Sequence, residues 1–412
     1  MTPQELIPEL PARIARQQSV AEFLAAVSQA LNIPSARYDE ANKRYETLTT
    51  LLEGCPQLAV LKPHMFPQGS FALGTVTRPL NGEEYDLDFI CHLLAAGHTV
   101  HTPRNVYDLL FRRLKSHGTY ENMVQLKNRC VRVIYANLFH MDITVAVSNP
   151  LCSNGGLLVP DRELRNWKAS HPAGYVAWFK KRAALVPQFR LLEKAFTQRH
   201  VALSGQTDPL PSEHTQGQGA LRSMIRLFKR HRDVFFEKRS DADFAPISII
   251  ITTLAAQAYE QAATKEVFDS ELDVVLTVLR NMPNLIGWEL DADTRQHVRV
   301  VANPSTSGEN FADKWKRGPE YNAAFNTWQQ QALADFSRLA ELEGRDRLQE
   351  SLRGLFGSRE TDPVFSTQTE HLNTQRLQQA AALTPLVGAS TKGLVNATGM
   401  PIRRTDFFGA AQ

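Results

Sequence analysis

The chain has 412 residues, 43% of them hydrophobic and 22% charged, which are the proportions of an ordinary globular protein with a large core. Its net charge of +3 is far below that of a protein that coats a duplex, so no long nucleic acid is expected as a partner. Apolar runs stay below the 18 residues of a membrane span, and we expect no secretory signal at the start of the sequence. The four cysteines form no C-x-x-C pair. We therefore expect a cytoplasmic protein with free thiols and no membrane partner.

The predicted elements change in character along the chain. Over the first 55 residues apolar side chains recur at helical spacing, with a break at Pro34-Ser35. Short alternating runs typical of strands then appear at residues 85–94, 129–136 and 139–147, with a helix near 106–114. Strands arranged around one crossover helix predict a mixed sheet covered by helices.

The second half is predicted to be mostly helical. Residues 204–219 are rich in Gly, Pro, Ser and Gln, which indicates a surface loop or lobe boundary. Helical periodicity runs from 220 to about 356, whereas 388–412 show no sustained apolar face and are expected to form a mobile or partner-ordered tail. We predict an α+β protein with three parts: N-terminal helices and a mixed-sheet core over 1–215, a helical lobe over 216–383, and a flexible tail over 384–412.

Three aspartates form the strongest chemical pattern. Asp86 and Asp88 lie two apart in a strand and project from one face, and Asp142 has the same position in a second alternating strand. Converging carboxylates raise one another's pKa unless a cation compensates their charge. Two Mg²⁺ ions, with Mn²⁺ as a possible substitute, held by three such acids suit in-line displacement at phosphorus.

A Gly-Ser element precedes the acid pair, with fifteen residues between them. Gly69 lets the backbone approach a phosphate, and Ser70 adds a hydroxyl at an expected helix N-terminus, where anions are favoured. With Gln68, these residues are the expected contacts to a triphosphate. A Gly-Ser pair alone is usually a turn, and D-x-D alone is usually a solvated strand end. The metal motif of a glycosyltransferase is the main chemical alternative for D-x-D. The ordered combination with a third acid favours a catalytic site.

These motifs resemble those of the polymerase-β-type nucleotidyltransferases, and most closely those of the bacterial CD-NTases, which are related to cyclic GMP-AMP synthase and oligoadenylate synthetase and serve anti-phage signalling. The resemblance covers roughly residues 60–320. It implies a bilobed fold, with a nucleotidyltransferase sheet and a mostly helical C-terminal lobe that hold nucleotides between them. It also implies Mg²⁺-dependent joining of ATP, GTP or other nucleoside triphosphates into a cyclic di- or trinucleotide, with release of pyrophosphate.

A basic stretch supplies a candidate cation. Residues 222–239 hold seven Lys or Arg against two acids, along one side of an amphipathic helix. By resemblance to the long helix of the family, Lys229 is the predicted phosphate ligand, and a lysine suits that role as a mobile point charge. The alternative is a solvated basic face in which Lys229 pairs with Asp233.

Two further segments contain candidate nucleotide contacts. Ser248 lies in an apolar run that opens a helix, with Pro246 in its first turn. By resemblance Ser248 contacts the nucleotide, and the alternative partner is a backbone carbonyl one turn back. Asp313 resembles a contact to a base or ribose but is equally typical of a helix surface. Phe311 and Trp315 are more typical of a core than of a base-stacking platform.

Two other functions remain open. The chain could place a nucleotidyl group on RNA, a protein or a small molecule, although its near-neutral charge disfavours RNA. It could also be an inactive nucleotide-binding scaffold, which would not need three clustered acids. By resemblance to some CD-NTase operons, the C-terminal Phe407-Phe408-Gly409-Ala410-Ala411-Gln412 could enter an operon-encoded conjugation or regulatory partner. Base selectivity, linkage and ring size are not readable from the sequence.

Overall fold

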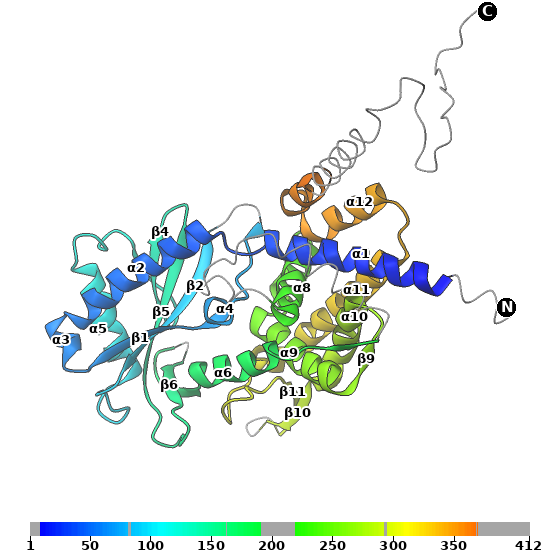
Figure 1. The fold of residues 1–412 in the computed structure, drawn as a ribbon. Coiled ribbons are helices and arrows are strands. Elements are labelled where there is room, and N and C mark those ends of the chain that lie inside the picture. The colour runs from blue at the N-terminus through cyan, green and yellow to red at the C-terminus, as the bar shows by residue number, and fades with distance from the viewer. Residues whose placement is uncertain are drawn as a thin grey trace, which may run out of the picture. The chain divides into compact units, whose positions relative to one another are not determined.

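The computed structural model describes residues 9–80, 84–161, 163–190, 219–291, 295–367 and 369, with side-chain environments from residue 13 onward. Residues Met1–Thr361 form one compact unit and Asp362–Gln412 another. The first unit has the predicted α+β architecture (Figure 1). Both predicted lobe boundaries, 215/216 and 383/384, lie outside the described residues, as does the predicted C-terminal tail.

The first unit is built of helices and strands. The helices are α1 (Glu9–Ala30), α2 (Ser35–Glu53), α3 (Pro56–Ala59), α4 (Gly69–Leu73), α5 (Pro103–Lys115), α6 (Pro172–Ala183), α8 (Ala220–Phe236), η3 (Ala242–Phe244), α9 (Ser248–Lys265), α10 (Glu271–Asn281), η4 (Met282–Leu285), η5 (Asp313–Arg317), α11 (Glu320–Glu341) and α12 (Arg345–Phe356). The strands are β1 (Pro63–Pro67), β2 (Tyr85–Leu93), β3 (Val124–Leu126), β4 (Val131–Tyr135), β5 (Phe139–Ser148), β6 (Leu157–Pro160), β7 (Trp167–Ser170), β8 (Gln188–Phe189), β9 (Val267–Phe268), β10 (Gly287–Leu290) and β11 (His297–Val300).

Seven strands of the described chain form the predicted mixed sheet, in the order β1-β2-β5-β4-β3, with β6 beside β5 and β7 beside β6. β2 and β5 run parallel, whereas β4 pairs with β5 as an antiparallel hairpin. The connection from β2 to β5 contains α5, β3 and β4, so two strands distant in sequence become direct neighbours at the centre of the sheet.

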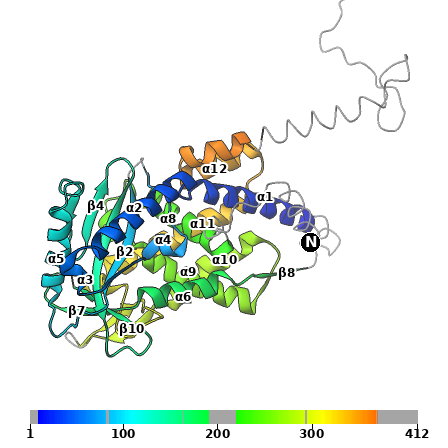
Figure 2. The same cartoon turned by 60° about the vertical axis from the view of Figure 1, so that its left-hand side comes forward.

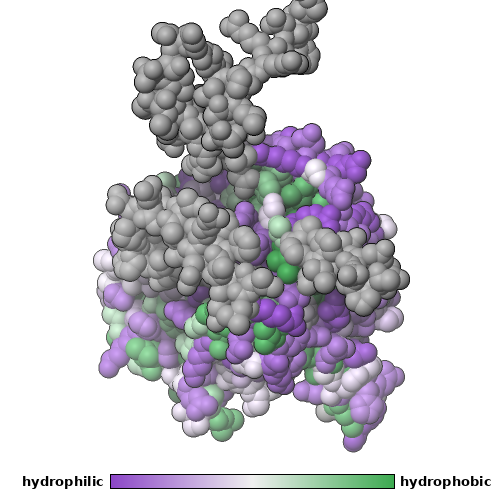
Figure 3. Space-filling view, turned by 45° about the vertical axis from the view of Figure 1, so that its right-hand side comes forward, coloured by the Kyte–Doolittle hydropathy of each residue, from purple (hydrophilic) through white to green (hydrophobic). Residues whose placement is uncertain are grey.

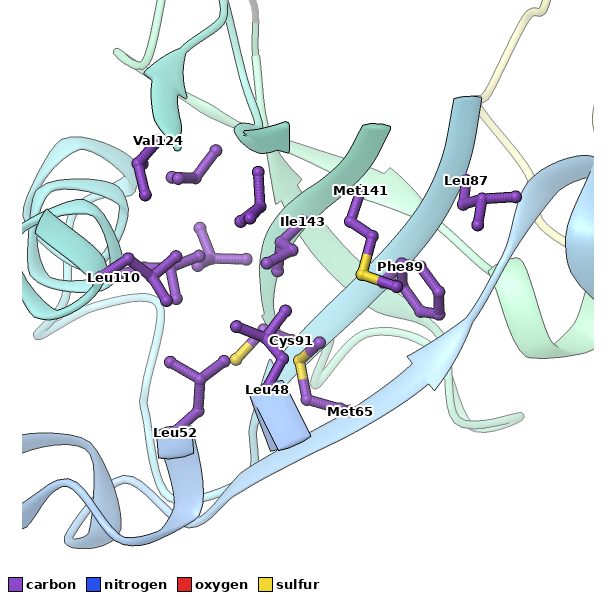
Figure 4. Packing of buried hydrophobic residues seen from close by; sticks show 14 of the residues in the cluster. Leu48, Leu52, Met65, Leu87, Phe89, Cys91, Leu110, Val124, Met141 and Ile143 are labelled. Atoms are coloured by element: carbon purple, nitrogen blue, oxygen red, sulfur yellow. The ribbon is translucent and has the colours of Figure 1, made fainter. Parts of the chain in front are cut away.

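The apolar face of this sheet is covered by α2 and α5, and Figure 4 shows the side chains that meet there. Because side chains alternate along a strand, β2 turns Leu87, Phe89 and Cys91 into this core while β5 contributes Met141 and Ile143, all fully buried. The helices add Leu48, Leu52 and Leu110. The same alternation sends the aspartates of β2 and β5 to the opposite face.

The N-terminal helices divide between the two lobes at Pro34. Figures 1 and 2 show α2 over the sheet and α1 along the helices of the second lobe. α1 packs on α8, α10 and α11, whereas α2 packs on β1. In the helical lobe, Phe336 makes edge-on contacts with Phe228 and Phe356, which join α11 to α8 and α12. The predicted pair of N-terminal helices is thus confirmed.

The helical prediction over 220–356 is incomplete, because β10 and β11 form an antiparallel hairpin there. The alternation of β11, with its valines at 298 and 300, and the stacking of Arg299 on Trp288 at 3.8 Å favour strands locally. The helix at Pro246 also begins later than predicted: α9 starts at Ser248, so Pro246 precedes its first turn.

Hydrophilic side chains dominate the described part of the face in Figure 3, and apolar groups there form small separate areas. No helix among the described residues is both long and apolar enough to cross a membrane.

The basic residues of α8 anchor the chain segment that follows α4. Arg222, Arg226 and Lys229 donate to the carbonyl oxygens of Leu73, Gly74 and Thr75 at 2.9, 3.0 and 2.8 Å, and Arg230 donates to that of Arg78 at 2.6 Å. Arg226, Lys229 and Arg230 are buried, so the alternative of a solvated basic face is wrong for them. Hydrogen bonds to charged groups offset the desolvation that this burial requires.

Arg226→Met tests this anchor. Arg226 also donates to Ser28 at 3.1 Å, so its removal leaves buried acceptors in both α1 and the loop after α4 without partners. We expect the variant to lose about 3 kcal/mol of stability, measured as a lower midpoint of thermal unfolding. Lys238→Met, at an exposed position just after α8, is the control and should unfold like the wild type. Equal midpoints in the two variants would contradict the anchoring role.

Candidate active site

The parallel pairing of β2 with β5 brings two of the aspartates together. Asp88 and Asp142 are direct partners in the register, and Asp86 lies opposite His140. Side chains of paired residues leave the sheet on the same face, with adjacent strands about 4.8 Å apart. The side chain of Asp86 is 62% exposed and that of Asp142 only 15%, so the acids extend from the sheet surface into the interior.

Asp88 lies in the most negative part of this group. Burial, followed by the charges of Asp142 and Asp86, raises the pKa of its carboxyl to about 7, and Lys229 and Arg132 oppose this shift. Burial and the two neighbouring carboxylates together therefore disfavour the charged form of Asp88 more than Lys229 and Arg132 favour it.

Arg132, which the sequence analysis did not single out, neutralises part of the group. It is the register partner of Asp142 on β4, and its Nε and Nη2 donate to the two carboxylate oxygens of Asp142, each at 2.7 Å. Nη2 also lies 3.1 Å from Oδ1 of Asp86. The guanidinium thus bridges the third acid and the first.

A second unpredicted group is built around His140. Its Nε2 lies 2.5 Å from the carboxylate of Glu84, and its Nδ1 lies 3.4 Å from both Asp86 and Arg132. Glu84 also accepts from the backbone N–H of Asn137 in the β4–β5 turn. These contacts tie the start of β2 to that turn and limit how far Asp86 can move.

Gly69 places the Gly-Ser element directly against Asp88. The Gln68 N–H donates to the Asp88 carbonyl at 2.8 Å, which extends the β1–β2 pairing to the start of α4. Gly69 has a φ of +59°, and a Cβ added there would lie 2.5 Å from Oδ2 of Asp88. Only glycine fits, because any side chain would collide with the carboxylate in a backbone conformation that L residues rarely adopt.

The helical lobe forms the opposite wall. Lys229 is buried, and burial followed by the charge of Arg232 lowers the pKa of its ammonium to about 8. Arg232 donates to the Ser248 hydroxyl at 3.2 Å and to the Pro246 carbonyl at 2.6 Å. The alternative partner for Ser248, a carbonyl one turn back, is therefore wrong, since Ser248 is the first residue of its helix.

Two clefts meet at the acids. The first, about 790 Å³, is lined by Ser70, Asp86, Lys229, Arg232 and Ser248 among others. The second, about 850 Å³, contains Gln68, Tyr175, Glu309 and Asp313. Both include Gly69 and Asp88. Each has the volume of a small-molecule site, so the geometry provides two such spaces that share one carboxylate.

The comparisons with known proteins agree with this geometry. Residues 18–183 match the family model described as the Second Messenger Oligonucleotide or Dinucleotide Synthetase domain. The chain is 26% identical over 357 residues to a c-di-GMP synthase of Roseivirga ehrenbergii, a match that covers 86% of this chain and 89% of that protein. Together these matches indicate a CD-NTase.

Other relatives support the same family. The cyclic dinucleotide synthase CdnG of Bradyrhizobium diazoefficiens is 25% identical, over 82% of this chain and 80% of that protein. The structure of that CD-NTase in complex with GTP has the same fold, with a TM-score of 0.64, 20% identity, and coverage of 85% of this chain and 100% of that one. The CdnC structure of Escherichia coli MS115-1 with ATP gives a TM-score of 0.56 at 16% identity, over 82% and 97% of the chains.

The structure places all of the sequence candidates around the two clefts, except Asp142, which is the register partner of Asp88 on the adjacent strand. Asp313 begins η5 in the second cleft. Trp315 belongs to the core, where its ring lies 5.8 Å from that of Phe325, whereas Phe311 lines the second cleft and meets Tyr175 edge-on. The sequence analysis missed Glu309, a partly buried acid that accepts from Asn303 at 2.7 Å and Ser170 at 3.2 Å.

The acids fit a divalent cation in chemistry and charge. Oxygen donors on neighbouring strands are what Mg²⁺ prefers, and burial together with the charges of Asp142 and Asp86 raises the pKa of Asp88. As they stand, however, no three His, Cys, Asp or Glu side chains in the described ranges form a group able to hold a metal ion. The fork of Arg132 occupies both oxygens of the third acid.

Asp88→Asn tests the charge imbalance. An ordinary aspartate loses its proton near pH 4 but Asp88 near pH 7, so between these values the folded chain holds a proton that the unfolded chain has lost. Asp88 therefore lowers stability as the pH rises from 4 to 7, by as much as about 3 kcal/mol. In EDTA, the variant should gain in thermal midpoint over the wild type at pH 8 and not at pH 4.

The control for this titration is Asp39→Asn, an exposed aspartate on α2, which should show no such pH-dependent difference. A gain for Asp88→Asn that is equal at pH 4 and pH 8 would show that Asp88 is not held at a raised pKa.

Gly69→Ala should destabilise the protein by about 2–4 kcal/mol through both backbone strain and the contact with Asp88. Gly155→Ala is a matched comparison, because Gly155 has a φ of +79° but its added Cβ would meet nothing within 4 Å. It should show only the strain, about 1 kcal/mol. Equal shifts in thermal midpoint would mean that the close approach to Asp88 is relieved at no cost.

Proposed function

We propose that this CD-NTase joins two guanosine triphosphates into a cyclic dinucleotide at the acids between the two clefts. The observation that carries the proposal is the pair of clefts that share Gly69 and Asp88. Such an arrangement holds a donor triphosphate and an acceptor ribose on either side of one reacting centre, which is the positioning that phosphoryl transfer requires. The names of the two relatives, a c-di-GMP synthase and a cyclic dinucleotide synthase, support the class of product.

In the proposed reaction, the first cleft holds the donor. The Gly69 backbone approaches the triphosphate, Ser70 donates a hydrogen bond to it, and Lys229 and Arg232 offset its charge from the opposite wall. Ser248, whose hydroxyl already meets Arg232, completes that wall. A divalent cation held by Asp86, Asp88 and Asp142 would neutralise phosphate charge and lower the pKa of the attacking hydroxyl.

The covalent change is the same in each of two steps. A ribose hydroxyl oxygen of the acceptor bonds to the α-phosphorus of the donor, the bond from that phosphorus to the β-phosphate bridging oxygen breaks, and pyrophosphate leaves. The hydroxyl proton passes to the carboxylates of the site or to water. A second transfer in the opposite sense closes the ring.

Guanine is favoured by the acids of the second cleft. Glu309, Asp291 and Asp313 line it, and a carboxylate accepts from the N1–H and N2–H₂ donors of guanine as a matched pair. Adenine presents no such pair of donors on its Watson–Crick edge. Nucleotidyl transfer to RNA, a protein or a small molecule remains the second candidate.

Incubation of the wild type with each ribonucleoside triphosphate and Mg²⁺ tests the proposal. We expect GTP alone to give a phosphatase-resistant product with the mass of a cyclic dinucleotide and two pyrophosphates per ring, measured by mass spectrometry. The double variant Asp86→Ala with Asp88→Ala should form at least 1,000-fold less product with an unchanged circular dichroism spectrum. Synthesis at the wild-type rate by the double variant would falsify the mechanism, and a product without guanine would overturn the assigned base.

A further inference from the structure

Arg132 is the one cation in contact with two of the three aspartates within the described chain. It comes from β4, where the hairpin register places it directly opposite Asp142. Two bonds of 2.7 Å use both oxygens of Asp142, and a third contact of 3.1 Å reaches Asp86. Its side chain is 20% exposed, so water screens the contact little. This forked geometry is the strong form of a charge-assisted pair.

The position of the guanidinium matters more than the strength of its hydrogen bonds to Asp142. A cation that joined Asp142 to Asp86 would occupy the space between them that Arg132 now spans. It would also meet a positive charge at contact distance. The third acid is therefore unavailable to a divalent ion as long as the fork is closed, although its register beside Asp88 is right.

The groups that face Arg132 permit it to move. On β5 these are Asp142 and His140, on β2 Asp86 and beyond them Asp88, and next to it on its own hairpin Cys130. Asp86 is largely exposed, which leaves an open side toward the first cleft. An arginine side chain can rotate toward that side without any change in the backbone.

We propose that Arg132 is a positioning residue that holds Asp142 in the nucleotide-free enzyme and releases it when a divalent cation enters with the nucleotide. The inference rests on the proposed function and adds a reason why the divalent cation binds together with the nucleotide and not before it. In the free enzyme the guanidinium supplies part of the missing positive charge, and the triphosphate must bring both the cation and a new anionic partner for Arg132. The enzyme alone then binds divalent ions weakly, and the enzyme with nucleotide binds them strongly.

Titration of nucleotide-free protein with Mn²⁺, with the free ion followed by electron paramagnetic resonance, tests the proposal. Arg132→Met removes the competing cation at nearly constant volume, and we expect Mn²⁺ to bind at least about tenfold more tightly than to the wild type. Adding Asp142→Asn to that variant should abolish the gain. Arg104→Met, which removes an exposed arginine paired with Asp108 on α5, is the matched control and should leave the affinity unchanged.

A structural role alone would leave Mn²⁺ affinity unchanged or weakened in Arg132→Met, and either result overturns the proposal. If Arg132→Met does not fold, Arg132→Lys keeps the charge but loses the fork, and it should still bind Mn²⁺ about threefold more tightly. An unchanged affinity in the lysine variant overturns the proposal as well.

The same titration separates the proposal from the proposed function, since it contains no nucleotide. If the wild type makes a cyclic dinucleotide but Arg132→Met has wild-type Mn²⁺ affinity, only the role of Arg132 fails. If Arg132→Met binds Mn²⁺ more tightly but the wild type makes no cyclic product, the function assigned to the site fails and the competition at Asp142 stands.

Discussion

Three carboxylates on two adjacent parallel strands repel one another, and the surroundings of the site are arranged around that repulsion. The register of β2 with β5 forces Asp88 against Asp142, and alternation places Asp86 on the same face. Burial makes the charge harder to tolerate, which is why the pKa of Asp88 rises to about 7. The protein supplies Arg132 from one side and Lys229 from the other, and neither removes the imbalance. The three carboxylates therefore favour binding of a further cation, which a triphosphate ligand can bring with it.

The second determinant is the anchoring of the loop after α4 by α8. Four basic side chains spaced along one helix donate to four carbonyl oxygens between Leu73 and Arg78. The loop joins the Gly-Ser element to the acid-bearing strand β2, so the helical lobe fixes the position of the phosphate-approaching backbone. Lys229 has both roles in the proposed mechanism: its ammonium bonds the Thr75 carbonyl while lining the first cleft. The charge of this helix thus serves assembly as well as ligand attraction.

The sequence was sufficient for the parts that depend on periodicity. Alternation around Asp86, Asp88 and Asp142 predicts which face they share, and the Pro34 break predicts two helices. It was insufficient where two distant segments meet. Arg226 is buried because it donates to the carbonyl oxygen of Gly74 in the loop after α4. The helical pattern of its own segment does not show that this loop lies beside it. The hairpin of β10 and β11 was missed because its strands are only four residues long.

Arg132 could have been found. It is a charged residue in an otherwise apolar strand, and the loop Ala136-Asn137-Leu138, with Asn137 at a φ of +62°, marks a three-residue hairpin turn. Counting back from that turn pairs residue 132 with 142. The contact of Arg132 with Asp86 cannot be found by such counting, because it depends on the parallel pairing of β2 beside β5.

Ring closure in the proposed reaction places a further demand on the second cleft. After the first transfer, the triphosphate that remains belongs to the nucleotide that acted as acceptor, so this group has to reach the acids for the second transfer. The second cleft must therefore tolerate a triphosphate as well as recognise a base.

The second cleft has a wall of mixed charge: Arg129, Lys168 and Lys316 line it beside the carboxylates of Glu309 and Asp313. A wall of mixed charge suits both needs, since the cations attract the phosphates while the acids accept from guanine. Asp88 and Gly69 are common to both clefts, so in the proposed reaction one set of acids would serve both transfers and the linear intermediate would change its orientation between them.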